Sequence, residues 1–344
     1  MITQLPPIRT VEKARALVLA ISLLSAAGCG ALQSSHGHQV TLSLSCRLPV
    51  GSLPAGVGGF IDFPGGKFLR DPQSASSYDS ASGRWLAVPR AMISPDGASY
   101  ATSEFNKVPP YGTSIRIVEM ASDSERAVWT VEGTAAVVGW TPGGIYLIRY
   151  ASHDANFVGP QLWVLDPTTG ERRLVIPQPK LGTGLPLFKA WTAMGGDAVW
   201  SKTVPDAPPS TDILERVDLS NGHSVTWLKA AQGELDVLGW DEQGHPFVVI
   251  RDEGSVRLVR LLGPNQTVPI GSDGFTPPGT MPPSELTDEH GAWFAADDGS
   301  IWLLRPGSQA ALTRVGAVPL PPAASPQSDV GFVLTQVLIA GPCK

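Results

Sequence analysis

The chain has 344 residues and a formal net charge of −6 at pH 7, with 42% hydrophobic and 16% charged residues. This composition is that of a globular protein and excludes an intrinsically disordered chain. The 37 glycines and 32 prolines follow no strict period, which excludes collagen. An acidic protein has no electrostatic attraction to nucleic acid, so we expect no nucleic-acid partner.

Residues 1–28 have the organisation of an export signal. Three basic residues precede an apolar run, ALVLAISLLSAA at 16–27, which is too short to span a bilayer stably. The sequence Ala26-Ala27-Gly28-Cys29 resembles the lipobox of bacterial lipoproteins. In that family the cysteine is lipidated and becomes the first residue of the mature protein. The resemblance implies lipidation of Cys29 and an extracytoplasmic protein of the bacterial cell envelope, anchored to a membrane by lipid. An ordinary secretory signal with an incidental cysteine is the alternative.

The rest of the chain divides into a tether and one domain. Residues 29–38 are small and polar, so we expect a flexible tether. Residues 39–344 are expected to form a single domain. If Cys29 carries lipid, Cys46 and Cys343 remain, and an even pair in an oxidising compartment indicates a disulfide. The two lie at opposite ends of the domain, so the bond would hold its termini together. Two buried free thiols are the alternative.

Two strand units alternate along the chain. The first joins two strands by a tight turn, and its clearest copies lie at 91–102, 137–149 and 237–251. The second joins two strands by the turn Asp-x-x-x-Gly, which begins at Asp79, Asp166 and Asp218. An aspartate caps its own turn and glycine supplies a positive φ there. Alternation of the two units predicts four short strands per repeat, as in a propeller blade.

One repeat carries a family signature. The run Ile93-Ser94-Pro95-Asp96-Gly97, followed by Tyr100-Ala101, resembles the WD40-like repeat of Tol-type bacterial propellers. The resemblance is architectural, covers about residues 57–340 and implies no ligand. The expected fold is therefore an all-β propeller of seven blades, with six as the alternative. Blades are expected to start near Gly58, Met92, Val137, Lys189, Asp236, Glu285 and Val330.

The last blade needs strands from elsewhere, because too few residues follow Val330 to form four strands. We expect Gln39–Ser45 to complete it. Pairing of N- and C-terminal strands would hide the sheet edges and close the ring.

The longest connections predict a candidate binding face. In a propeller, connections within a blade between its second and third strands share one face with the connections between blades. Three consecutive blades have long connections of the first kind, and residues 177–187 form a long connection of the second kind. Long loops on a rigid scaffold are common places for function. The face would carry Tyr111, His153, Phe157 and Lys180. Variable filler is the alternative interpretation.

Catalytic and metal-binding motifs are absent from the sequence: there is no zinc-protease histidine spacing, nucleophile elbow or phosphate-binding loop. We therefore expect no catalytic residue, metal or cofactor. Arg149 and Arg251 end equivalent strands, which favours structural ion pairs over a pocket lining. Trp140 and Trp240 share one repeat position, as do Trp163 and Trp302, and repeat-locked aromatic residues indicate packing rather than a sugar-stacking platform.

Two functions remain open. The first is a propeller that holds an unknown envelope protein or polymer on one face. The second is a propeller-based lyase or hydrolase with its active site at the channel mouth. The fold cannot decide between them. We favour binding, because the sequence offers no convergent set of histidine, carboxylate and arginine side chains.

Overall fold

The computed structural model describes residues 44–344, except for 54, 107–110, 151–160, 177–187, 196–197, 205–211, 231–232, 253, 279–284, 307–310 and 322–335. The chain divides into two units, residues 1–41 and 42–344. The expected signal and tether, residues 1–38, lie outside the described residues. In the described part, no helix combines the length and the apolar character that a membrane crossing requires.

The described strands form seven antiparallel sheets, of which five have four strands, one has three and one has two. The first sheet joins the two ends of the domain in the order β25 (Gln336–Ile339), β1 (Arg47–Leu53), β2 (Gly59–Asp62) and β3 (Lys67–Arg70). The next two are β4 (Ser77–Asp79) with β5 (Arg84–Leu86), and β6 (Ser99–Asn106) with β7 (Gly112–Glu119) and β8 (Glu125–Glu132). The short 3-10 helix η1 (Arg90–Met92) lies between these two in the chain.

Four further sheets each use four consecutive strands. They are β9 (Thr134–Thr141), β10 (Gly144–Tyr150), β11 (Gln161–Leu165) and β12 (Arg172–Ile176); β13 (Phe188–Gly195), β14 (Ala198–Val204), β15 (Ile213–Asp218) and β16 (Ser224–Lys229); β17 (Glu234–Trp240), β18 (Pro246–Asp252), β19 (Ser255–Gly263) and β20 (Gln266–Ile270); and β21 (Glu285–Asp288), β22 (Gly291–Ala295), β23 (Ser300–Leu304) and β24 (Thr313–Ala317). In each of these sheets, every strand pairs only with strands next to it in the chain, as the alternating two-strand units predict.

The predicted Asp-x-x-x-Gly turns form for a local reason. At Asp166 the carboxylate accepts the backbone N–H groups of Thr168 and Thr169, at 2.7 and 2.9 Å. Gly170 closes the turn by donating to the Asp166 carbonyl, at a φ of +75° that favours glycine. These backbone donors to the carboxylate hold the pKa of Asp166 below its ordinary value. Asp218 builds the same turn with Gly222, so both aspartates are turn-formers.

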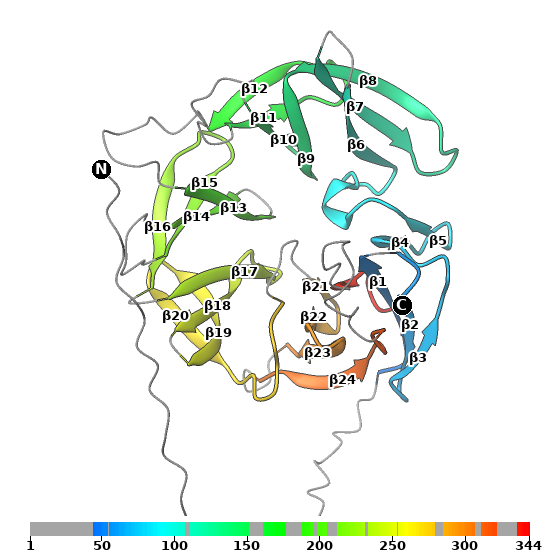
Figure 1. Cartoon of the computed structure of the whole chain (residues 1–344), viewed down its shortest axis with the longest axis vertical. Helices are drawn as coiled ribbons and strands as arrows, with labels where there is room; N and C mark the ends of the chain where they lie inside the picture. The colour runs from blue at the N-terminus through cyan, green and yellow to red at the C-terminus, as the bar shows by residue number, and fades with distance from the viewer. Residues whose placement is uncertain are drawn as a thin grey trace, which may run out of the picture. The chain divides into compact units, whose positions relative to one another are not determined.

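Hydrophobic cores lie between successive sheets rather than within them. Val131 and Ile115 of the β6–β8 sheet pack on Val137 and Leu147 of the next sheet. Equivalent cores join each of the sheets from β9 onward to its successor. Figure 1 shows these sheets following one another in chain order. Four-stranded antiparallel meanders that pack face to face in sequence are the arrangement of a β-propeller.

The sheet that joins the chain ends uses a different strand from the expected one. Gln39–Ser43 lie outside the described residues, and Ser45 is not in a strand; instead β1 pairs with β25, from Val50 opposite Ile339 to Leu53 opposite Gln336. Residues 47–53 contain Pro49, which has no N–H to donate to a strand partner. It lies just beyond the ladder with β25, where its carbonyl accepts the N–H of Ala340.

The predicted blade from Gly58 is wrong as a single sheet. Its first two strands, β2 and β3, pair with β1, whereas β4 and β5 pair only with each other among the described strands. The β4–β5 hairpin packs through Tyr78 and Trp85 against Phe60 of β2, with ring centroids 5.1 and 5.4 Å apart. On its other side, Leu86 belongs to a small core with Met120. Non-local pairing with the C-terminal strand therefore overrides the local strand order.

Candidate functional site

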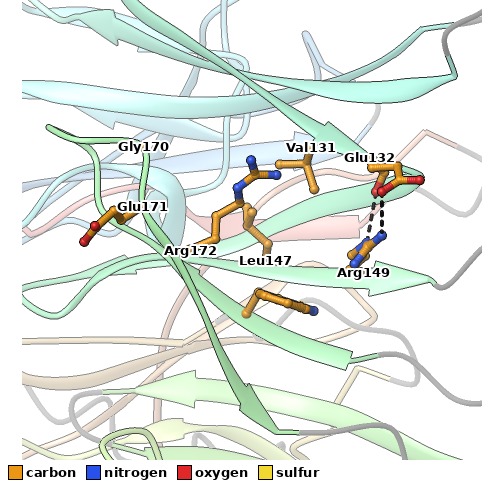
Figure 2. A pocket seen from close by; sticks show the side chains of 8 residues that line it. Val131, Glu132, Leu147, Arg149, Gly170, Glu171 and Arg172 are labelled. Carbon is orange, nitrogen blue, oxygen red and sulfur yellow. Dashed lines mark hydrogen bonds and ion pairs between the residues drawn. The ribbon is translucent and has the colours of Figure 1, made fainter.

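A groove lies between the β8 edge of one sheet and the β9–β12 sheet, and has a volume of about 420 Å³. Figure 2 shows its lining residues, which are Val131, Glu132, Leu147, Arg149, Trp163, Gly170, Glu171 and Arg172. Val131 and Leu147 are almost completely buried, with 4% and 1% exposure, because they belong to the core between the two sheets. The groove therefore has an apolar floor, and charged side chains stand around it.

Arg149 is held by three contacts near the end of β10. Its Nε donates to the backbone carbonyl of Glu132 at 2.9 Å, and its guanidinium lies 5.7 Å from the centre of the Trp163 ring. The Glu132 carboxylate is 3.8 Å from an Arg149 nitrogen, yet that side chain is 90% exposed. An exposed ion pair at this distance contributes little. The carbonyl and the indole therefore do most of the positioning, and the exposed carboxylate contributes little.

The other end of the groove is formed by the turn between β11 and β12. A side chain at Gly170 would collide with the Trp129 ring of β8, so the turn sits tightly against the neighbouring sheet. Arg172 follows this turn and is exposed. Among the hydrogen bonds and ion pairs of the described residues, none involves the Arg172 side chain. Figure 2 shows its guanidinium directed toward Val131, whereas Glu171 points away from the groove.

The equivalent arginine of a later sheet makes a different set of contacts. Arg251 of β18 forms an ion pair with Asp236 and donates to the carbonyl of Pro278 at 3.0 Å. Arg251 and Asp236 therefore form a structural ion pair, as the sequence pattern favours. Arg149 also has an ion-pair partner, Glu132, but it lines the groove as well. For Arg149 the interpretation as a pocket-lining residue therefore holds.

Of the four residues predicted to form the binding face, the structure describes only Tyr111. Tyr111 is 52% exposed and directly precedes β7, where Gly112 pairs with Glu132. Tyr111 therefore lies at the same end of the sheets as Glu132 and Arg149. His153, Phe157 and Lys180 lie outside the described residues, so their place on this face stays a prediction. In the chain, the segment with His153 and Phe157 begins directly after β10, the strand that carries Arg149.

Sequence reasoning missed the groove itself. The repeat position of Trp163 predicts a packing residue, and this side chain does pack against the core between the two sheets. Its Nε1 also donates to Gln161 at 2.8 Å, and its ring supports Arg149. Arg149 and Trp163 are diagonal neighbours on one face of paired strands, because Leu147 pairs with Trp163 and Arg149 with Gln161. This register belongs to the folded sheet, and no local sequence pattern indicates it.

A second titratable cluster lies between the β17–β20 and β21–β24 sheets. The Glu285 carboxyl packs against Gly239, where any side chain would collide with it. Burial raises the pKa of Glu285 to about 8, and the nearby Asp241 carboxylate adds to this rise, while hydrogen bonds from Thr287 and the Trp240 backbone oppose it. A pKa of about 8 favours the neutral form of Glu285 at pH 7. Nothing in the residues around it in the sequence indicates this.

Asp241 beside that cluster is part of a turn. Its carboxylate accepts the backbone N–H groups of Gln243 and His245 at 3.0 and 2.9 Å. The His245 Nδ1 lies 3.1 Å and an Arg260 nitrogen 3.4 Å from its other oxygen. The described residues also bring Cys46, His290 and Cys343 together. The two cysteines form a disulfide with Cα atoms 5.4 Å apart, so their sulfur atoms are not free to bind a metal.

No protein-family model matches the chain, and no curated protein is significantly similar to it in sequence. The structure of TolB from Acinetobacter baumannii is similar with a TM-score of 0.38 and 15% identity, over 80% of this chain and 67% of the TolB chain. A prolyl endopeptidase structure is similar with a TM-score of 0.41 and 15% identity, over 74% of this chain. This chain spans only 41% of that endopeptidase structure. Neither likeness is close enough to carry a functional argument.

Proposed function

We propose that this chain is an exported, lipid-anchored β-propeller that binds an envelope protein or polymer at one end of its sheets. The groove beside Arg149 is the observation that carries this proposal. It combines an apolar floor with two arginines, one of them held in place, which is the composition of many ligand sites. It also lies at the end of the sheets where Tyr111 is exposed and from which the segment 151–160 leaves β10.

The proposed ring has seven positions, one of them reduced to the β4–β5 hairpin. This hairpin packs on β2 on one side and on the core with Met120 on the other, so it occupies a position of its own between two larger sheets. The β21–β24 sheet packs on the sheet of β25 and β1 through Trp293 and Leu48. These contacts link the last sheet to the first, and the pairing of β1 with β25 would close the ring.

Export and anchoring are supported by the chain ends. The lipobox-like sequence before Cys29 supports lipidation, and the Cys46–Cys343 disulfide suits an oxidising compartment outside the cytoplasm. We expect Cys29→Ser to leave the protein unprocessed or to release it from the membrane fraction, because the thiol is the atom that receives the lipid. Fractionation and the mass of the mature chain measure this. A variant that matures and fractionates like the parent would exclude lipid anchoring.

The binding end is tested by cross-linking in the intact envelope. A photo-reactive amino acid at Tyr111 is expected to form adducts with an envelope component, because this position is exposed beside the groove. The matched control places the same amino acid at Gln243, which is exposed in the turn between β17 and β18. Adducts should be several-fold more abundant from position 111. Equal adducts from both positions, or adducts from position 243 alone, contradict the assignment of the face.

A further inference from the structure

Building on the proposed binding role, we propose that the groove between β8 and β9–β12 binds an acidic peptide segment of a partner protein. A carboxylate of that segment pairs with Arg172, and a neighbouring apolar side chain enters the groove over its aliphatic floor. The charges and surfaces of the groove favour this peptide. Both its carboxylate and its apolar side chain have a matching group among the described residues.

The first match is electrostatic. Arg172 is exposed, makes no hydrogen bond or ion pair within the described part of the chain, and directs its guanidinium over the groove, while Glu171 beside it points away. An arginine fork pairs with a carboxylate through two parallel hydrogen bonds, and such charge-assisted bonds are among the strongest in proteins. The chain as a whole has a net charge of −6. A guanidinium without a partner among the described residues is therefore a local exception on an acidic protein, and it supplies what an acidic partner needs.

The second match is the fixed cation at the far end of the groove. Arg149 is held by the Glu132 carbonyl and the Trp163 ring, so its position does not depend on the Glu132 carboxylate. That carboxylate is 90% exposed and can turn into solvent when an acidic ligand enters. The groove then presents an arginine at each end of an apolar floor, and its two carboxylates, Glu132 and Glu171, are both exposed to solvent. An extended segment with an apolar side chain next to a carboxylate fits this pattern.

The third observation favours a peptide over a polysaccharide. Sugar rings are commonly bound by stacking on an open aromatic face. In this groove the Trp163 ring is covered by the Arg149 guanidinium at 5.7 Å. No other aromatic side chain is among the residues that line the described groove. Its floor is aliphatic, which suits a side chain of a peptide better than the flat face of a sugar.

The test is a selection of phage-displayed random heptapeptides on the full chain purified from the envelope in detergent. The same selection is made on Arg172→Ala and on the matched control Arg173→Ala. Arg173 is the next residue of β12 and faces the opposite side, where it donates to the carbonyl of Ser220 at 3.4 Å. Both arginines are exposed, so both variants should fold, which thermal unfolding verifies.

We expect the parent and Arg173→Ala to select peptides with Asp or Glu next to an aromatic or aliphatic residue. Arg172→Ala should lose this selection. In an enriched peptide, replacing the acid by its amide should weaken binding about tenfold or more, the loss expected for a charge-assisted hydrogen bond.

Three results would overturn the inference: no enriched peptide on the parent, enriched peptides without an acid, or unchanged selection on Arg172→Ala. Binding of a carboxylated polysaccharide such as polygalacturonate, without any peptide, would also overturn it. In that case the proposed binding role itself survives. That role fails separately, if cross-linking does not favour position 111 over position 243.

Discussion

Replacing both Cys46 and Cys343 by alanine is expected to lower the free energy of unfolding by about 2–5 kcal/mol. The bond joins residues 297 positions apart, so in the unfolded chain it closes a very long loop. Cross-linking so long a loop removes much conformational entropy from the unfolded state. The native state has little to lose besides the bond, because β25 and β1 also pair directly. Urea unfolding of the parent and the double variant measures the effect.

The parent treated with a reducing agent is the control for this experiment. It keeps both cysteine side chains and loses only the bond, so it should match the double variant. Hydrogen exchange adds a local readout. The β25 strand is tied to the sheet by four residue pairs with β1 and by the nearby disulfide. Its amides should therefore exchange faster in the variant, while those of the central strand β18 change least. An unchanged unfolding midpoint would show that the bond does not act through chain entropy.

Glu285→Gln is expected to flatten the dependence of stability on pH between about pH 4.5 and pH 8. The carboxyl has a pKa of about 8 in the folded protein, raised from 4.5. Between these values the unfolded chain loses the proton and the folded chain keeps it. Stability therefore falls with rising pH by about 1.4 kcal/mol per pH unit from this group, and falls no further above pH 8. Glutamine cannot ionise, so it removes this slope.

The hydrogen bonds around Glu285 explain why glutamine should fit. Thr287 Oγ1 lies 2.7 Å from the Glu285 carboxyl and 3.0 Å from the Trp240 carbonyl. A hydroxyl has one proton, so when Thr287 donates it to the carbonyl, the neutral Glu285 donates to Thr287. The glutamine amide can donate in the same way. The variant should match the parent near pH 5 and exceed its unfolding free energy by on the order of 3–5 kcal/mol at pH 8.

Denaturant unfolding at pH 5, 6, 7 and 8 measures this difference. Glu242→Gln is the matched control, because Glu242 is exposed in the turn beside Asp241. It should keep the slope of the parent. The other charged groups at this contact, Asp241, His245 and Arg260, are present in all three proteins. Parallel stability curves for the parent and Glu285→Gln would contradict a raised pKa of the Glu285 carboxyl.

The features predicted best from the sequence are those set by a few consecutive residues. The turns at Asp166 and Asp218 form because an aspartate, the backbone amides two to three residues after it and a glycine are all local. The strand pairs on either side of Thr141 and Asp241 follow the alternating pattern for the same reason. The disulfide geometry also agrees with the end-to-end placement of Cys46 and Cys343.

The features that the sequence predicted poorly depend on distant partners. The described strand that pairs with β25 is Arg47–Leu53, whereas Gln39–Ser45 were expected, and Pro49 lies just beyond this ladder. The strands after Gly58 divide between two sheets for a related reason, since β2 and β3 follow β1 into the sheet of the C-terminal strand. In both cases a strand partner from the other end of the chain decides the outcome.

By itself, the sequence determined an all-β chain of repeated strand pairs and a pair of cysteines at the two ends of the domain. These follow from residue periodicity, turn chemistry and order along the chain. Only the tertiary structure decided which arginine lines a groove. Arg149 and Arg251 end equivalent strands, but one meets the Glu132 carbonyl and Trp163 while the other meets Asp236. Those contacts arise where neighbouring sheets and connections pack together, and such packing joins residues that no local pattern relates.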